Sequence, residues 1–159
     1  MYLRLSTLAL IGSLSIHAAA LAAPSENEAA ILKIEQDLTV AQTAAAVTAA
    51  WAENGVFEDF TPGEVRGLAA LRKDLEVQFS QTASFTDQIL RIKVEADNHL
   101  GFAYSTQHLV AQGKGVPDVD MVFRQTDCYR KKDGKWQLVY QHLSVPFDAK
   151  TGKAVFDSK

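Results

Sequence analysis

The clearest indication of the fold is residues 126–136, which read Thr126-Asp127-Cys128-Tyr129-Arg130-Lys131-Lys132-Asp133-Gly134-Lys135-Trp136. Asp-Gly-Lys is typical of a tight turn between two strands, and β-branched or aromatic residues stand on both sides of it. We therefore expect two antiparallel strands here, roughly Val119 to Arg130 and Trp136 to Val145.

Two more strands are expected just before this hairpin. Apolar and charged residues alternate from Leu90 to Ala96, which predicts a strand with Leu90 and the other apolar residues on its buried face. Another strand is expected over roughly Leu100 to Ala111, and Gly113-Lys114-Gly115 turns the chain into the next one. Because short turns join neighbouring strands in opposite directions, the four strands predict one antiparallel sheet.

Helical patterns precede the sheet. Ser25 and Glu28 have the spacing of a capping box, which predicts that a helix begins there. Its apolar positions recur every three or four residues, at Ile31, Ile34, Leu38 and Ala41.

Two shorter helices are expected between this first helix and the sheet. Residues Ala44 to Trp51 read as an Ala-rich helix that Asn54-Gly55 ends, and Val56 to Phe60 as a short strand. A third amphipathic helix starts at Leu68. Helices grouped before a run of long strands predict an α+β domain in which the helices cover one face of a curved sheet.

Composition limits the possible functions. The 159 residues suit one domain, and 16 basic against 19 acidic side chains give a net charge of -3. This balance offers no broad cationic surface for nucleic acid or for a membrane surface. The single cysteine, Cys128, excludes an intrachain disulfide. The histidines have no metal-ligand spacing, so we expect neither a metal nor another cofactor.

The first 22 residues resemble an export signal. Arg4 provides the positive start, an uncharged apolar run follows from Leu5 to Ile16, and Ala20-Leu21-Ala22 has the small residues of a cleavage site. We expect cleavage after Ala22, which leaves a single domain at residues 23–159 in the periplasm or outside the cell. About a dozen apolar residues are too few for a spanning helix, which needs about 20. An uncleaved anchor is the alternative.

Three stretches together resemble one family: Val56-Phe57-Glu58-Asp59 leading to Val65-Arg66-Gly67, residues 126–136, and His142-Leu143-Ser144-Val145-Pro146. They are similar to the SnoaL-like branch of the nuclear transport factor 2-like superfamily, which includes the ketosteroid isomerases. The resemblance covers about residues 26–155. It implies a cone-shaped barrel of the cystatin-like fold, with three N-terminal helices on a strongly curved antiparallel sheet. It also implies an apolar pocket and, frequently, a homodimer packed through the sheet.

The resemblance implies roles for two aspartates. Asp59 falls where the isomerases keep the aspartate that shuttles a proton, and Asp127 falls where they keep a protonated aspartic acid, a case that is well described. Each has a structural alternative. Asp59 could cap the turn at Thr61-Pro62-Gly63, and Asp127 could pair with a nearby arginine, Arg124 or Arg130, or with a histidine.

One histidine and one glutamate complete the candidates. His142 lies in the last strand and could serve as a general acid or base, or simply tie strands together. The isomerases place a tyrosine on their first helix, where this chain has Glu35 by simple counting, and a glutamate donates a hydrogen bond only when protonated.

Aromatic side chains are the candidates for the pocket wall, although such residues are more often core. The expected wall consists of Trp51, Phe57, Phe60, Tyr104, Phe123 and Tyr140.

Two functions remain open. The first is an exported domain that binds a small hydrophobic molecule without turnover. The second is an isomerase-, cyclase- or dehydratase-like enzyme that uses Asp59, Asp127 and His142 for proton transfer. The enzyme requires two of these three groups to converge in the cavity, whereas binding does not.

Overall fold

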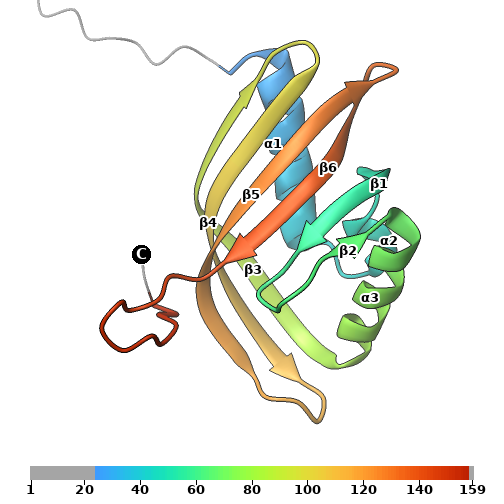
Figure 1. Cartoon of the computed structure of the whole chain (residues 1–159). Helices are drawn as coiled ribbons and strands as arrows, with labels where there is room; N and C mark the ends of the chain where they lie inside the picture. The colour runs from blue at the N-terminus through green and yellow to red at the C-terminus, as the bar shows by residue number, and fades with distance from the viewer. Residues whose placement is uncertain (1–23, 158–159) are drawn as a thin grey trace, which may run out of the picture.

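The computed structural model describes residues 24–157, which form three helices packed on one six-stranded sheet (Figure 1). This confirms the predicted α+β class with helices on a curved sheet. The predicted export signal at residues 1–22 lies outside the described residues. Between residues 24 and 157, no helix combines the length and the apolar character that a membrane span requires.

Helix α1 (Glu26–Val40) begins at the predicted capping box. Glu28 N donates to Ser25 Oγ over 3.2 Å, and Ser25 N donates to Glu28 Oε2 over 2.7 Å. The helix lies along strands β3 (Thr82–Ala96) and β4 (Leu100–Gly113). The side chains that α1 buries there are Ile31 and, against expectation for a charged residue, Glu35.

The second helix is shorter than expected. Helix α2 (Ala44–Val47) ends four residues before Trp51, which instead begins strand β1 (Trp51–Glu58). Asn54-Gly55 therefore lies inside a strand rather than ending a helix. The reason is tertiary, because β1 pairs in parallel with strand β6 (Lys135–Ser144) and Trp51 lies opposite Leu138. A side chain at Gly55 would meet the Trp51 ring at 2.7 Å, so glycine is required there.

The third helix follows the sequence prediction closely. Strand β2 (Val65–Arg66) pairs with β1, and α3 (Leu68–Ser80) then packs beside β1. Leu71 and Leu75, which lie one turn apart on α3, are buried.

The four long strands form the expected antiparallel sheet. They are β3, β4, β5 (Val119–Lys132) and β6, and the complete strand order is β2-β1-β6-β5-β4-β3. Figure 1 shows the strong bend of this sheet, with the helices on its hollow side. The parallel contact of β1 with β6 was not predicted, because nothing local to either segment specifies it.

One predicted strand face is wrong at its start. Strand β3 begins at Thr82, eight residues before Leu90, and the β3–β4 register shifts between Ile89 and Arg91. Leu90 is the extra residue of this β-bulge and is 36% exposed, so it does not share the buried face of Ile92.

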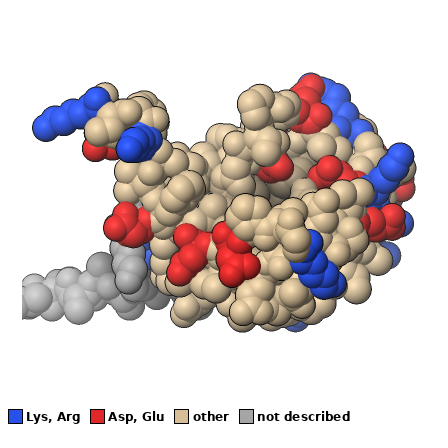
Figure 2. All heavy atoms as spheres, turned by 90° about the horizontal axis from the view of Figure 1, so that it is seen from below, with Lys and Arg blue, Asp and Glu red and all other residues tan. Residues whose placement is uncertain are grey.

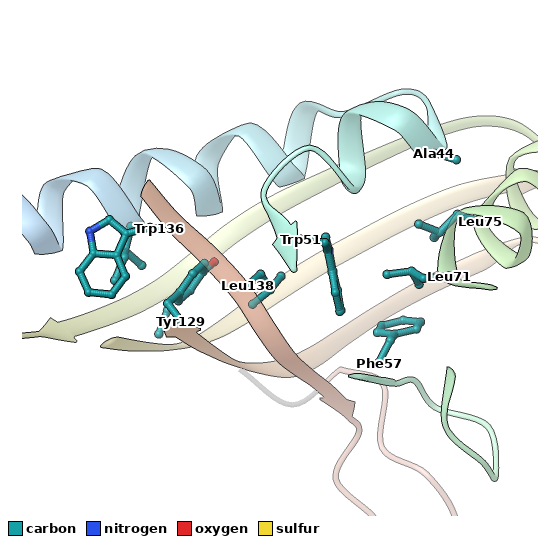
Figure 3. Packing of buried hydrophobic residues seen from close by; sticks show 10 residues of the cluster. Ala44, Trp51, Phe57, Leu71, Leu75, Tyr129, Trp136 and Leu138 are labelled. Carbon is teal, nitrogen blue, oxygen red and sulfur yellow. The ribbon is translucent and has the colours of Figure 1, made fainter. Parts of the chain in front are cut away.

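Most of the apolar core fills the space between the helices and the sheet. We call the sheet face that carries Ala103, Asp127 and Tyr129 the inner face, and the opposite one the outer face. Figure 3 shows Trp51, Phe57, Tyr129 and Leu138 on the inner side of the sheet, with Leu71 of α3 near Phe57. Trp51 and Phe57 pack edge to face, with ring centroids 6.2 Å apart.

Candidate functional site

A pair of carboxyl groups is buried where α1 meets the inner face. Glu35 follows Ile31 by one helical turn and therefore points at the sheet with it, and Asp127 shares the inner face of β5 with Tyr129. Glu35 is 1% exposed and Asp127 is 0% exposed. Carboxylate side chains are seldom fully buried without a cationic partner, so the burial of this pair requires an explanation.

Neighbouring side chains donate hydrogen bonds to both carboxyls. The Tyr129 hydroxyl donates to Glu35 Oε1 over 2.8 Å. Gln125 Nε2 donates to Asp127 Oδ2 over 2.6 Å and reaches Glu35 Oε2 at 3.4 Å. Among the described side chains, Asp127 Oδ1 receives no donor. Gln141 of β6, opposite Asp127 in the sheet, also interacts with this carboxyl. The two carboxyl groups interact directly, and a proton on one of them lets it donate to the other.

The pKa directions agree with a shared proton. Burial raises the pKa of Asp127 well above its usual value, and the charge of Glu35 raises it further. Burial also raises the pKa of Glu35, while its interactions with Asp127, Tyr129 and Gln125 oppose that rise. Asp127 therefore holds its proton to the higher pH, so we assign the shared proton to Asp127 and, once the pair is singly ionised, the negative charge to Glu35. The raised pKa of the Tyr129 phenol, due first to burial, keeps it a donor.

A third carboxyl group, that of Asp87, lies on the inner face farther along the sheet. In the amide orientation that satisfies both neighbours, Gln107 Nε2 donates to Asp87 Oδ2 over 2.8 Å and Gln107 Oε1 accepts from Ser105 Oγ over 2.7 Å. Ser105 lies opposite Gln125 in the sheet. Polar side chains thus form a continuous row on the inner face, which we call the polar file: Asp87, Gln107, Ser105, Gln125 and Asp127. The interior is therefore less apolar than the sequence predicts.

Replacing Asp87 by asparagine should remove one pH dependence of stability. Burial raises the pKa of Asp87 to about 7, so in the wild type ionising this group destabilises the folded protein as the pH rises from about 4 to about 7. Because Asp87 is partly exposed, we expect Asp87→Asn to be more stable by about 2 kcal/mol at pH 8, and equal to the wild type below pH 4. Urea unfolding across this pH range measures the difference. A constant difference at all pH values would contradict the assignment.

The three predicted catalytic residues do not converge. Asp59 lies in the loop after β1, where its Oδ1 accepts from Thr61 N over 2.7 Å and from Thr61 Oγ1 over 2.5 Å. This is the turn-capping alternative. Asp127 lies opposite Gln141 on the inner face, so His142, the next residue of β6, points to the outer face. Asp127 is also not paired with Arg124 or Arg130, which lie on the exposed outer face.

The predicted pocket aromatics separate into two groups. Trp51, Phe57 and Phe123 are buried on the inner side, and Phe60 packs edge to face on Phe123 with ring centroids 5.5 Å apart. The tyrosines lie on the outer face instead. Tyr104 is 52% exposed there, and the Tyr140 hydroxyl donates to Glu58 Oε2 over 2.7 Å.

The larger hollows among residues 24–157 lie outside the cone interior. Hollows of about 540 and 750 Å³ open on the outer face of the sheet. An apolar cavity of about 170 Å³ lies between α3 and the ends of β3 and β4, lined by Leu75, Phe79, Phe85 and Leu109 among others. Figure 2, seen from below, shows the surface hollowed near its middle, with acidic side chains in and beside the hollow.

Sequence reasoning missed part of this site, although signals for it exist. Glu35 was noted only as a replacement for tyrosine, yet its position four residues after Ile31 places it on the buried stripe of α1. Asp87 lies two residues from Phe85 and two from Ile89, so the alternation of strand side chains places it on the same face as these apolar residues. Within the described chain, no group of three or more His, Cys, Asp or Glu residues is arranged to hold a metal ion.

Comparison with known families matches residues 36–148 to the model of the SnoaL-like domain. Among the curated proteins compared, none matches the chain significantly.

Solved structures share the fold at low identity. An NTF2-like protein of unknown function from Pseudomonas putida KT2440 is 24% identical, with a TM-score of 0.73 over 84% of this chain and 96% of that chain. A proposed dehydratase of the NTF2-like family from Streptomyces avermitilis is 14% identical, with a TM-score of 0.65 over 78% of this chain and 100% of that chain. A type 2 hexachlorocyclohexane dehydrochlorinase, LinA, is 14% identical, with a TM-score of 0.65 over 74% of this chain and 84% of that chain. At these identities the similarity concerns the fold alone.

Proposed function

Since this chain belongs to the SnoaL-like domain family, we propose that it binds a small, largely hydrophobic molecule inside the cone, with an oxygen of that molecule against the Glu35–Asp127 pair. The buried pair is the observation that carries the proposal. A carboxyl group that stays protonated at neutral pH in a dry interior donates a hydrogen bond to a carbonyl or hydroxyl oxygen. Perturbed carboxyls also concentrate at functional sites.

The electrostatics of the pair favour binding over turnover. If Asp127 gave its proton away completely, two negative charges would face each other in the interior, where their repulsion is weakly screened. In the proposed complex the oxygen of the bound molecule replaces Glu35 as the acceptor of the Asp127 proton, and the single charge stays on Glu35, which Tyr129 and Gln125 stabilise. We therefore propose recognition of a neutral oxygen as the principal role.

Entry of such a molecule requires the loop between β1 and β2 to move. Phe60 of this loop is 40% exposed and packs against Phe123 of the inner face, two residues from Gln125. Because Phe60 covers Phe123, displacing it would expose the Phe123 ring and the part of the inner face next to it.

A proton-transfer enzyme is the second candidate, and Asp87 favours it. Its pKa of about 7 makes it a base that titrates near neutral pH, on the same sheet face as the acid Asp127. Dehydration or isomerisation of a carbonyl or hydroxyl compound would use such an acid and base. The names dehydratase and dehydrochlorinase of two similar structures agree with this candidate.

Binding of cyclohexenone, with cyclohexene as the control, tests both candidates. We expect the ketone to bind about tenfold more tightly than the hydrocarbon, because one hydrogen bond contributes about 1 kcal/mol or more. Asp127→Leu should abolish the preference, whereas Asp127→Asn, which keeps a donor, should retain most of it. Ligand-observed NMR measures the affinities, and equal affinity of the wild type for both probes would reject the proposal.

The same variants separate binding from turnover. An enzyme should exchange deuterium from solvent into the ketone, and Asp127→Asn should slow this exchange by about a hundredfold or more because asparagine holds no transferable proton. A wild type that binds the ketone without exchange fits the first candidate alone.

We propose further that the domain works outside the cytoplasm, as a homodimer. Residues 1–22 support export, and the intact mass of the purified protein tests cleavage after Ala22. The end of the outer face beside the β3–β4 turn supports a contact between copies, because Leu100 and Phe102 are exposed at the start of β4. Native mass spectrometry of the wild type and of Leu100→Lys tests the dimer, and also detects any small molecule that copurifies.

A further inference from the structure

Two arginines flank one threonine on the outer face of the sheet. Arg91 of β3 lies opposite Thr106 of β4, and Thr106 lies opposite Arg124 of β5. Strands are about 4.8 Å apart, so the two arginine backbones are about 10 Å apart, within reach of both long side chains. Arg91 Nη2 donates to Thr106 Oγ1 over 3.1 Å, which turns its guanidinium toward the middle of this row.

The positive charge of the row is not compensated. The row opens into the hollow of about 540 Å³, whose lining also includes Lys93 and contains no acidic residue. Among residues 24–157, neither Arg91 nor Arg124 forms an ion pair, and Lys93 has only Glu95 at 3.8 Å. The chain as a whole carries a net charge of -3, so this local cluster runs against the overall charge.

The β-bulge in β3 creates the cluster. If the same residues formed a regular strand with no bulge, Arg91 would have the same parity as Asp87 and Ile89 and would point to the inner face. The bulge reverses this direction and places Arg91 beside Thr106. Bulges often redirect side chains near functional sites.

A flat aromatic surface borders the charged row. Tyr104, two residues from Thr106, lines the hollow and stacks on Phe102, with ring centroids 6.3 Å apart and 14° between the ring planes. Guanidinium groups bind planar carboxylates through two parallel hydrogen bonds. We propose that the outer-face hollow binds a small aromatic carboxylate, held by Arg91 and Arg124 with its ring against Tyr104.

Benzoate and the neutral benzyl alcohol test this site. We expect the wild type to bind benzoate at millimolar concentration or lower and benzyl alcohol at least tenfold more weakly, measured by chemical-shift titration. Arg91→Gln and Arg124→Gln should each weaken benzoate binding about tenfold or more. Arg66→Gln is the matched control, because it removes the same charge from β2, where Arg66 is paired with Glu64.

Several outcomes would overturn the proposal. Equal binding of the acid and the alcohol, or an equal loss in Arg66→Gln, would show that no specific anion site exists. Arginine variants that change the subunit count in native mass spectrometry, with no benzoate binding to the wild type, would make the row a contact between copies. The site is independent of the function proposed for the interior, so Asp127→Leu should leave benzoate binding unchanged.

Discussion

Tyr129→Phe should lower the free energy of unfolding by about 2–3 kcal/mol at pH 8 and by only about 1 kcal/mol at pH 3. The phenol donates to Glu35 Oε1, and we assign the negative charge of the buried pair to Glu35 because the pKa of Asp127 is the one raised well above its usual value. A hydrogen bond to a buried charge contributes about 1.5–3 kcal/mol, whereas one to a neutral group contributes about 1 kcal/mol. Urea unfolding at several pH values measures both quantities.

The sign of this pH dependence follows from linkage. Loss of the donor raises the folded-state pKa of Glu35 further above its unfolded value. The added destabilisation is therefore absent at low pH and grows as the pH rises through the folded-state pKa of Glu35 in the wild type, which burial already holds above its usual value. Glu35→Gln is the informative partner variant, because it removes the charge and leaves an amide oxygen for Tyr129. In the Glu35→Gln background, Tyr129→Phe should cost the same at both pH values. A pH-independent loss in the wild-type background would contradict the placement of the charge on Glu35.

Gly101→Ala should also lower the free energy of unfolding by about 3 kcal/mol, for a steric reason. Gly101 of β4 lies beneath α1, and a Cβ there would overlap Ile31 Cδ1 and lie 3.0 Å from Ala96 Cβ. Ile31 is fully buried, so the overlap cannot be relieved by turning its side chain into solvent. Overpacking a filled core costs about 1–3 kcal/mol. Thermal or urea unfolding measures the loss.

The rescue by Ile31→Val identifies the contact. Valine lacks the Cδ1 atom, and this change alone should cost about 1 kcal/mol. In combination with Gly101→Ala it should restore about 1–2 kcal/mol, so the two changes are not additive. Additive losses would mean that Ala96 or the backbone, rather than Ile31, opposes the added methyl group.

The position of α1 links the two predictions. Ile31 and Glu35 are one turn apart on the same face of the helix, so the close packing of Gly101 against Ile31 also fixes the distance of Glu35 from Asp127. If Gly101→Ala shifts α1 outward, the pair should lose part of its direct contact, and the pH dependence of stability should change with it.

Local patterns predicted most of the elements and part of the site. The capping box at Ser25, the apolar period of α3 and the Asp133-Gly134 turn specify structure through neighbours within a few residues, and the structure confirms them. Strand alternation placed Asp127 on one face with Tyr129, and the structure confirms this. The same alternation failed at Leu90, because a bulge is not marked by any residue type there.

Short-range periodicity and turn chemistry therefore specify the α+β class, the antiparallel meander and the faces of most strands, so these features could be predicted from the sequence. Three features depend on the tertiary structure instead. They are the parallel pairing of β1 with β6, the burial of Glu35 against Asp127, and the separation of His142 from these two carboxyl groups. Glu35 and Asp127 are 92 residues apart in the sequence. Their shared proton arises from burial and proximity, which exist only after α1 has packed on the folded sheet.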